Sequence, residues 1–150
     1  MRPYQFLRIT AMLLVAYAGL SSVAGEPRPW MFNARRGEGY LIDLVSVDPA
    51  PGTPLASGSK VTFQVKVRYT LSIATGGAIA LIFQDEVDGN ARDNTPPVKQ
   101  RVDAGSGTRT LVDTVFIPSV SEFRLFVPLF PDGMEETTGE IVIRYPIVRK

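Results

Sequence analysis

The chain has 150 residues, 45% of them hydrophobic and 21% charged, and it contains neither Cys nor His. One domain with a substantial core fits that length, and a formal net charge of +1 provides no electrostatic footprint for nucleic acid. Without His and Cys there can be no Ser-His-Asp or Cys-His nucleophile, no zinc site of imidazole or thiolate ligands, and no disulfide. We therefore expect a protein that is not an enzyme and that has no nucleic-acid partner.

The first 24 residues have the pattern of an export signal. Arg2 and Arg8 supply positive charge, an apolar run covers residues 9–20, and small residues at 22–24 suit a cleavage site. The run is shorter than the roughly 20 apolar residues that span a membrane, so an uncleaved anchor is the weaker alternative. We predict a signal peptide at 1–24, a mature chain without a membrane span, and a periplasmic or secreted protein of bacterial type.

Residues 25–39 (GEPRPWMFNARRGEG) combine Pro, Gly and adjacent arginines without a helical or strand period. This pattern predicts a flexible arm or linker before the folded domain. The arm holds Trp30, the single Trp of the chain, and Phe32. These two aromatic residues could dock on a partner, or the arm could fold back over one open end of the domain and cover Trp30.

Residues 40–150 are predicted to form the domain, and one segment determines its class. Gly or Pro interrupts this region so often that only residues 59–75 run uninterrupted for more than a dozen positions. Within that segment apolar and polar residues alternate strictly, which is the period of a half-buried strand. The apolar set is Val61, Phe63, Val65, Val67 and Tyr69, and the polar set is Thr62, Gln64, Lys66, Arg68 and Thr70.

Six further segments have strand character, with turn residues between them. In residues 108–117, Arg109 and Asp113 share a face with Leu111 and Val115, so the pattern does not settle which side is buried. Gly76-Gly77 and residues 103–107 are interpreted as turns. Seven short strands with frequent turns predict an all-β, two-sheet antiparallel sandwich. The other predicted strands are 42–47, 78–84, 98–102, 123–127 and 140–147.

Three short stretches, PGTPL at 51–55, GSKVTF at 58–63 and FIP at 116–118, carry a resemblance to a known fold. With them, residues 41–148 resemble the immunoglobulin-like and fibronectin type III-like sandwiches of exported bacterial proteins. The chain lacks the Cys pair and the core Trp of antibody-type domains. The resemblance implies a fold but no active site, because such sandwiches serve in adhesion, chaperoning, sugar binding and purely structural roles.

An acidic segment at 85–94 (DEVDGNARDN) is the densest group of oxygen ligands. Asp85, Asp88, Asn90 and Asp93 could hold calcium, which prefers six to eight oxygens, although the EF-hand spacing is absent. A solvated connection between strands is the simpler interpretation, since Asp, Asn and Gly favour turns. No other cofactor is predicted.

Residues 123–131 (FRLFVPLFP) are apolar on both faces. Either this strand is central and covered twice, or it presents Phe126 and Phe130 on a surface for a partner. We predict a non-catalytic, exported binding module that contacts a protein or carbohydrate through Trp30, Phe32, Phe126 and Phe130. The alternative is a carbohydrate-binding or calcium-dependent protein that uses residues 85–93.

Overall fold

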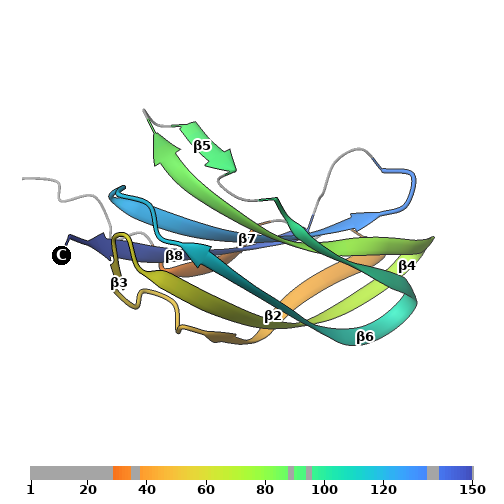
Figure 1. Ribbon diagram of the computed structural model, residues 1–150. Helices are drawn as coiled ribbons and strands as arrows, with labels where there is room; N and C mark the ends of the chain where they lie inside the picture. Colours follow the sequence, from red (N-terminus) through yellow and green to blue (C-terminus); the bar gives the residue numbers. More distant parts are fainter. Residues whose placement is uncertain (1–28, 35–37, 88–89, 94–95, 135–138, 150) are drawn as a thin grey trace, which may run out of the picture.

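The computed structural model describes residues 29–34, 38–87, 90–93, 96–134 and 139–149 (Figure 1). The predicted signal peptide at 1–24 lies outside these residues, as do residues 25–28 and 35–37 of the predicted arm. Within the described part of the chain, no helix has the length and apolar character needed to cross a membrane.

The described residues form an all-β domain of eight strands (Figure 1). The hydrogen-bonded order is β1-β8-β7-β4-β2, with β5 and β6 also paired to β4, and every one of these pairs is antiparallel. The short β3 pairs in parallel with the end of β8. The strands are β1 (Met31–Ala34), β2 (Tyr40–Asp48), β3 (Leu55–Ala56), β4 (Lys60–Val87), β5 (Asn90–Asp93), β6 (Val98–Phe116), β7 (Glu122–Pro131) and β8 (Gly139–Val148).

Two long strands carry the sheet from one layer of the molecule into the other. The segments predicted at 59–75 and 78–84 are the two halves of the 28-residue β4, and those predicted at 98–102 and 108–117 are the halves of the 19-residue β6. The first half of β4 pairs with β2 and β6, whereas the second half pairs with β6, β7 and β5. The all-β, antiparallel prediction is confirmed, but the two layers belong to one bent sheet rather than to two separate sheets.

The turns predicted at Gly76-Gly77 and at 103–107 are wrong, because both lie inside continuous strands. The β4–β6 register shifts between Leu71 and Gly76, so both strands change direction there together. Gly77 is needed for close backbone approach: a Cβ at this position would lie 2.6 Å from the Phe130 carbonyl oxygen. Glycine within a strand thus marks a bend against a neighbouring backbone here, not the end of the strand.

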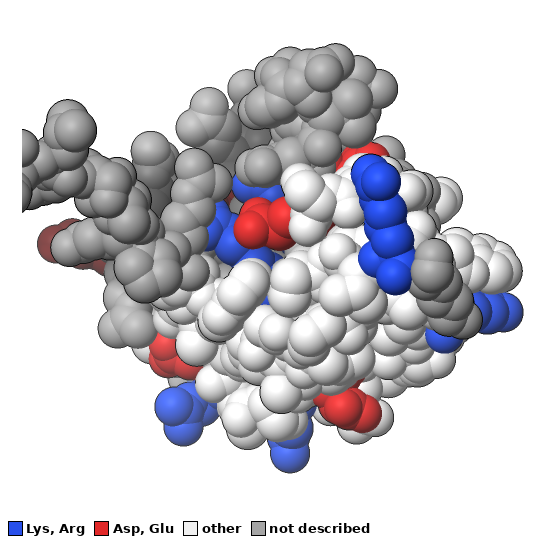
Figure 2. Space-filling view, turned by 90° about the vertical axis from the view of Figure 1, so that its left-hand side faces the viewer, with Lys and Arg blue, Asp and Glu red and all other residues white. Residues whose placement is uncertain are grey.

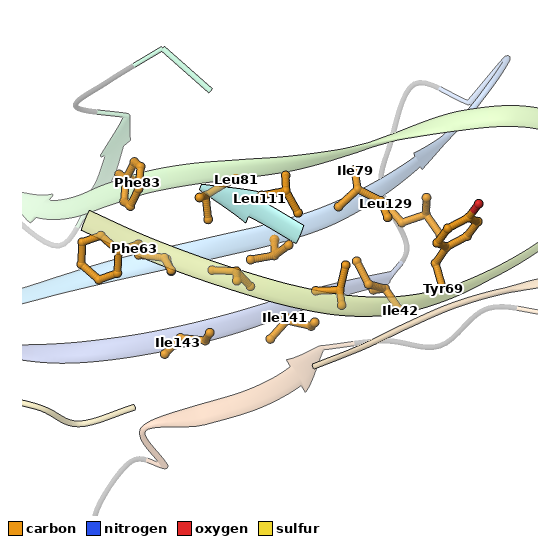
Figure 3. Packing of buried hydrophobic residues seen from close by; sticks show 14 of the residues in the cluster. Ile42, Phe63, Tyr69, Ile79, Leu81, Phe83, Leu111, Leu129, Ile141 and Ile143 are labelled. Atoms are coloured by element: carbon orange, nitrogen blue, oxygen red, sulfur yellow. The ribbon is translucent and has the colours of Figure 1, made fainter. Parts of the chain in front are cut away.

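The core lies between the two layers and is built from alternate residues of both halves of β4 (Figure 3). Phe63 from the first half and Phe83 from the second meet with ring centroids 5.3 Å apart. The rings of Phe123 and Tyr145, from β7 and β8, lie 6.0 and 5.3 Å from that of Phe63. All four side chains are almost fully buried, so they join the layers across the core.

Part of the predicted arm is an ordered element. Met31–Ala34 form β1, which pairs with residues 140–143 of β8, so the expectation of an arm without regular structure does not hold for these residues. Nearby, the Asn33 amide donates to the Asp43 carboxylate of β2 at 3.3 Å. The first and last strands of the sheet order are therefore linked through side chains.

Candidate binding surface

A row of apolar side chains crosses the outer face of β1, β8, β7 and the second half of β4. In the strand register Phe32 lies opposite Val142, Val142 opposite Phe126, and Phe126 opposite Ile82. Directly opposed residues have Cβ atoms about 5 Å apart, so the four side chains are neighbours on one face. We call Phe32, Val142, Phe126 and Ile82 the apolar row. Val142 is nearly buried among the others, while the remaining three are half-buried.

The structure brings two of the predicted binding residues into this row and places the other two beside it. Phe130 lies four residues from Phe126 on the same face of β7, opposite Ala78, and is also half-buried. Trp30 precedes β1, where its carbonyl accepts a hydrogen bond from the Arg144 N–H at 2.7 Å. Its indole packs against Gly52, yet Trp30 remains 46% exposed. The fold-back of the arm therefore covers only part of Trp30.

Charged side chains border the apolar row at the Trp30 end. The Arg144 guanidinium lies over the Phe32 ring, 5.2 Å from its centroid, which is the geometry of a cation–π contact. Its Nε is 3.5 Å from the Glu122 carboxylate, and Arg124 is the residue directly opposite Arg144. The Arg144 side chain is only 11% exposed, so its planar group extends the aromatic surface.

A second ion pair stands at the Phe130 end of this face. Arg101 donates two hydrogen bonds to the Asp132 carboxylate, at 2.6 and 2.8 Å. These bonds lower the pKa of Asp132 and raise that of Arg101. Figure 2 shows the opposite end of the molecule, seen from the left of Figure 1, where the described basic and acidic side chains are interspersed around an uncharged area. Among the described residues, neither sign of charge predominates at that opposite end.

The most exposed large hydrophobic side chain of the described residues is not one of the four predicted binding residues. Phe116, at the end of β6, is 69% exposed, and Val112 on the same face is 51% exposed. The Lys60 ammonium lies 5.8 Å from the centroid of the Phe116 ring. The alternation of β6 contains this signal, since burying Leu111 and Val115 forces Val112 and Phe116 outward. This alternation identifies Phe116 as exposed only when the buried side of β6 is known.

Three of the four predicted calcium ligands, Asp85, Asn90 and Asp93, lie in strands rather than in an irregular loop. Residues 84–87 of β4 pair with residues 90–93 of β5, with Asp85 opposite Arg92 and Gln84 opposite Asp93. Backbone pairing thus outweighs the turn preference of Asp and Asn over most of this segment, which corrects the expected connection. Asp88 lies outside the described residues, as do the side chains of Asn90 and Asp93.

Asp85 is the one predicted ligand whose side chain is described. It is half-buried, and its Oδ1 is buried without a hydrogen-bond partner among the described residues. In this part of the chain no three Asp, Glu, His or Cys side chains come together to hold a metal ion. Calcium binding by the 85–93 segment stays a prediction, which the melting temperature with and without millimolar calcium would test.

No protein-family model matches the chain, and no curated protein matches its sequence. Among solved structures, the chain is similar to the CARDB domain of a Pyrococcus furiosus protein, solved in complex with di-metal ions. The identity is 7%, the match covers 81% of this chain and 96% of that one, and the TM-score is 0.43. What the protein binds therefore has to be inferred from its own surface.

Proposed function

We propose that this protein is a non-catalytic, exported binding module of immunoglobulin-like type, which contacts a protein partner through the apolar row and the aromatic residues beside it. The observation that carries the proposal is the register of Phe32, Val142, Phe126 and Ile82 across four strands. An outward face that only meets water needs no such row, and contiguous apolar patches on a surface commonly mark interaction sites.

The residue types around the row favour a protein partner over a carbohydrate. Aromatic side chains and arginine are enriched at protein interfaces, and the best contributors stand where neighbouring side chains exclude water. Phe126 and Arg144 fit this description, since both are partly covered by their neighbours. The positive charges of Arg2 and Arg8, the apolar run at 9–20 and the small residues at 22–24 support export.

Substitution of one phenylalanine on each outer face tests the proposed surface. The full chain would be produced in an exporting host and used, as wild type, Phe126→Ser and Phe116→Ser, to capture proteins from the exported fraction of its own source. We expect the wild type and Phe116→Ser to retain the same partner and Phe126→Ser to lose it, with all three proteins folded by circular dichroism. Equal capture by Phe126→Ser, or loss only in Phe116→Ser, would refute this surface.

The proposed export has a separate test. N-terminal sequencing of the protein recovered outside the cytoplasm should begin at Gly25, as expected for cleavage after Ala24. A retained Met1 on cytoplasmic protein would contradict export and leave the binding surface to be judged by the capture experiment.

A further inference from the structure

One edge of β6 has no neighbouring strand among the described residues. From Gly105 to Phe116 this strand pairs with β4 on one side only. The Ile117 N–H donates to the Ser59 carbonyl, so odd-numbered residues here direct their backbone groups toward β4. Even-numbered residues from Thr108 to Phe116 consequently direct theirs toward the open edge. Such an edge is a template for another strand unless something blocks it.

Side chains of β6 itself occupy three of the backbone groups on this edge. Gln100, from the first half of β6, donates to the Thr110 carbonyl at 2.8 Å. Arg109 donates to the Thr108 carbonyl at 2.9 Å, and the Asp113 carboxylate accepts from the Thr114 N–H at 2.7 Å. A strand that added here would have to displace all three side chains to complete its ladder.

Two of these residues are charges on the core side of the strand. Arg109 and Asp113 alternate with the buried Leu111 and Val115, and Asp113 lies directly opposite the fully buried Phe63. A charge at such a position is costly unless its head group stays hydrated or paired. The Arg109 guanidinium lies 5.5 Å from the centroid of the Tyr69 ring, which holds it at the edge. Inward-pointing charges are a known means of preventing strand addition at a sheet edge.

We propose that the β6 edge is a latent pairing surface for a second copy of this chain, and that Gln100, Arg109 and Asp113 keep it closed. The segment 108–116 reads TRTLVDTVF, in which Arg109 and Asp113 are the only charges among residues that favour strands. Two copies can pair antiparallel about Val112, because a twofold axis brings the same edge of each copy together. Pairing would then bury apolar surface of the exposed Val112 and Phe116 at the junction and remove it from water.

Removal of the two charges should open the edge. We expect full-chain Arg109→Thr/Asp113→Thr to form dimers or larger species at protein concentrations at which the wild type is monomeric, as measured by light scattering after size exclusion. The matched control Lys66→Thr/Glu38→Thr removes one positive and one negative charge from exposed positions that are not on the edge strand, since Lys66 lies on the adjacent β4 and Glu38 precedes β2, and it should stay monomeric. A wild type that already pairs through β6, a monomeric double variant, or an equally associated control would overturn the proposal.

Proline at the centre of the edge distinguishes strand pairing from general loss of stability. The Val112 N–H faces the open edge, so Val112→Pro removes no hydrogen bond to β4 but prevents a second strand from pairing there. Added to Arg109→Thr/Asp113→Thr, it should restore the monomer, and continued association would contradict pairing at this edge.

If circular dichroism shows that the double variant is unfolded, Gln100→Ala/Asp113→Asn keeps the contact of Arg109 with Tyr69. This milder variant then decides the question in the same assay.

Discussion

The two halves of β4 have the same kind of inner face and very different outer faces. Inward-facing residues of the first half, such as Phe63, and of the second half, such as Phe83, are fully buried. Outward, the first half carries the exposed, polar residues Thr62, Gln64, Lys66 and Arg68. The second half carries Ala78, Ala80 and Ile82, which are half-buried or buried although they face away from the core.

This difference shows that the core alone does not reveal where a candidate binding surface lies. Both halves supply the core in the same way, so the inner pattern predicts fold but not function. On the outside, the second half has β7 beside it, which carries Phe126, whereas the first half lies between β2 and the second half of β6, where hydroxyl pairs such as Thr62 with Thr114 occur. The proposed binding surface therefore lies where outward positions are apolar, and the outward positions of the first half are polar.

The largest predicted change in unfolding free energy comes from comparing an inward-facing with an outward-facing residue of the first half of β4. Phe63→Ala should lower the free energy of unfolding by about 3–5 kcal/mol, because it removes a fully buried ring that contacts three other aromatic rings. The adjacent Gln64→Ala should change it by less than about 0.5 kcal/mol, since this side chain is exposed. Urea unfolding measures both, and similar losses would mean that the outer face also stabilises the fold.

The sequence alone predicted the strand at residues 61–70 and its buried side, because strict alternation of apolar and polar residues is a short-range pattern that determines both. It was not sufficient at Gly76-Gly77, because a Gly pair suits both a turn and a bend. What decides between them is the Phe130 carbonyl of a strand more than fifty residues later in the chain. Likewise, no local pattern accounts for the charges of Arg109 and Asp113 on the core side of β6. Their hydrogen bonds to backbone groups show that they lie at an open edge of the sheet, which depends on the strand order.

The candidate site was predictable to a similar extent. Phe126 and Phe130 could be selected because both faces of their segment are apolar, and the structure places them outward on a central strand. Their proximity to Phe32 could not be derived, because it depends on the register of β1 against β8. The pairing of strands far apart in sequence is set by the whole core rather than by local preference.

A second prediction concerns the point where the two halves of β4 meet. Gly77→Ala should destabilise the protein by about 1–3 kcal/mol, because the new Cβ would lie 2.6 Å from the backbone oxygen of Phe130, which cannot move without shifting β7. Gly139→Ala is the matched control, since its Cβ would meet the Tyr40 ring at 3.5 Å and the Ile42 side chain at 3.7 Å, which are ordinary contacts. Thermal unfolding of the two variants should give a clear difference, and equal melting temperatures would show that the bend at Gly77 tolerates a side chain.

The smallest predicted effect concerns a hydrogen bond that ties the layer of β2 to that of β8. The Tyr145 hydroxyl donates to the Pro49 carbonyl, which follows β2, at 2.7 Å, and its ring packs on Phe63 of the first half of β4. Tyr145→Phe keeps the ring and removes the hydrogen bond, so at neutral pH it should cost about 1 kcal/mol. The same substitution should also change how stability depends on pH.

Burial of the hydroxyl, with a smaller contribution from the Asp48 charge, raises the pKa of Tyr145 above the value of about 10 expected for an unfolded chain. A raised pKa in the folded state means that the stabilisation is complete below about pH 10 and declines as the pH rises, because the unfolded chain releases the proton more readily. Tyr145→Phe lacks this titration. The difference in unfolding free energy between wild type and variant, measured in urea, should therefore shrink between pH 8 and pH 10.5. A difference that stays constant over that range would place the hydroxyl in water rather than in the buried contact between the layers.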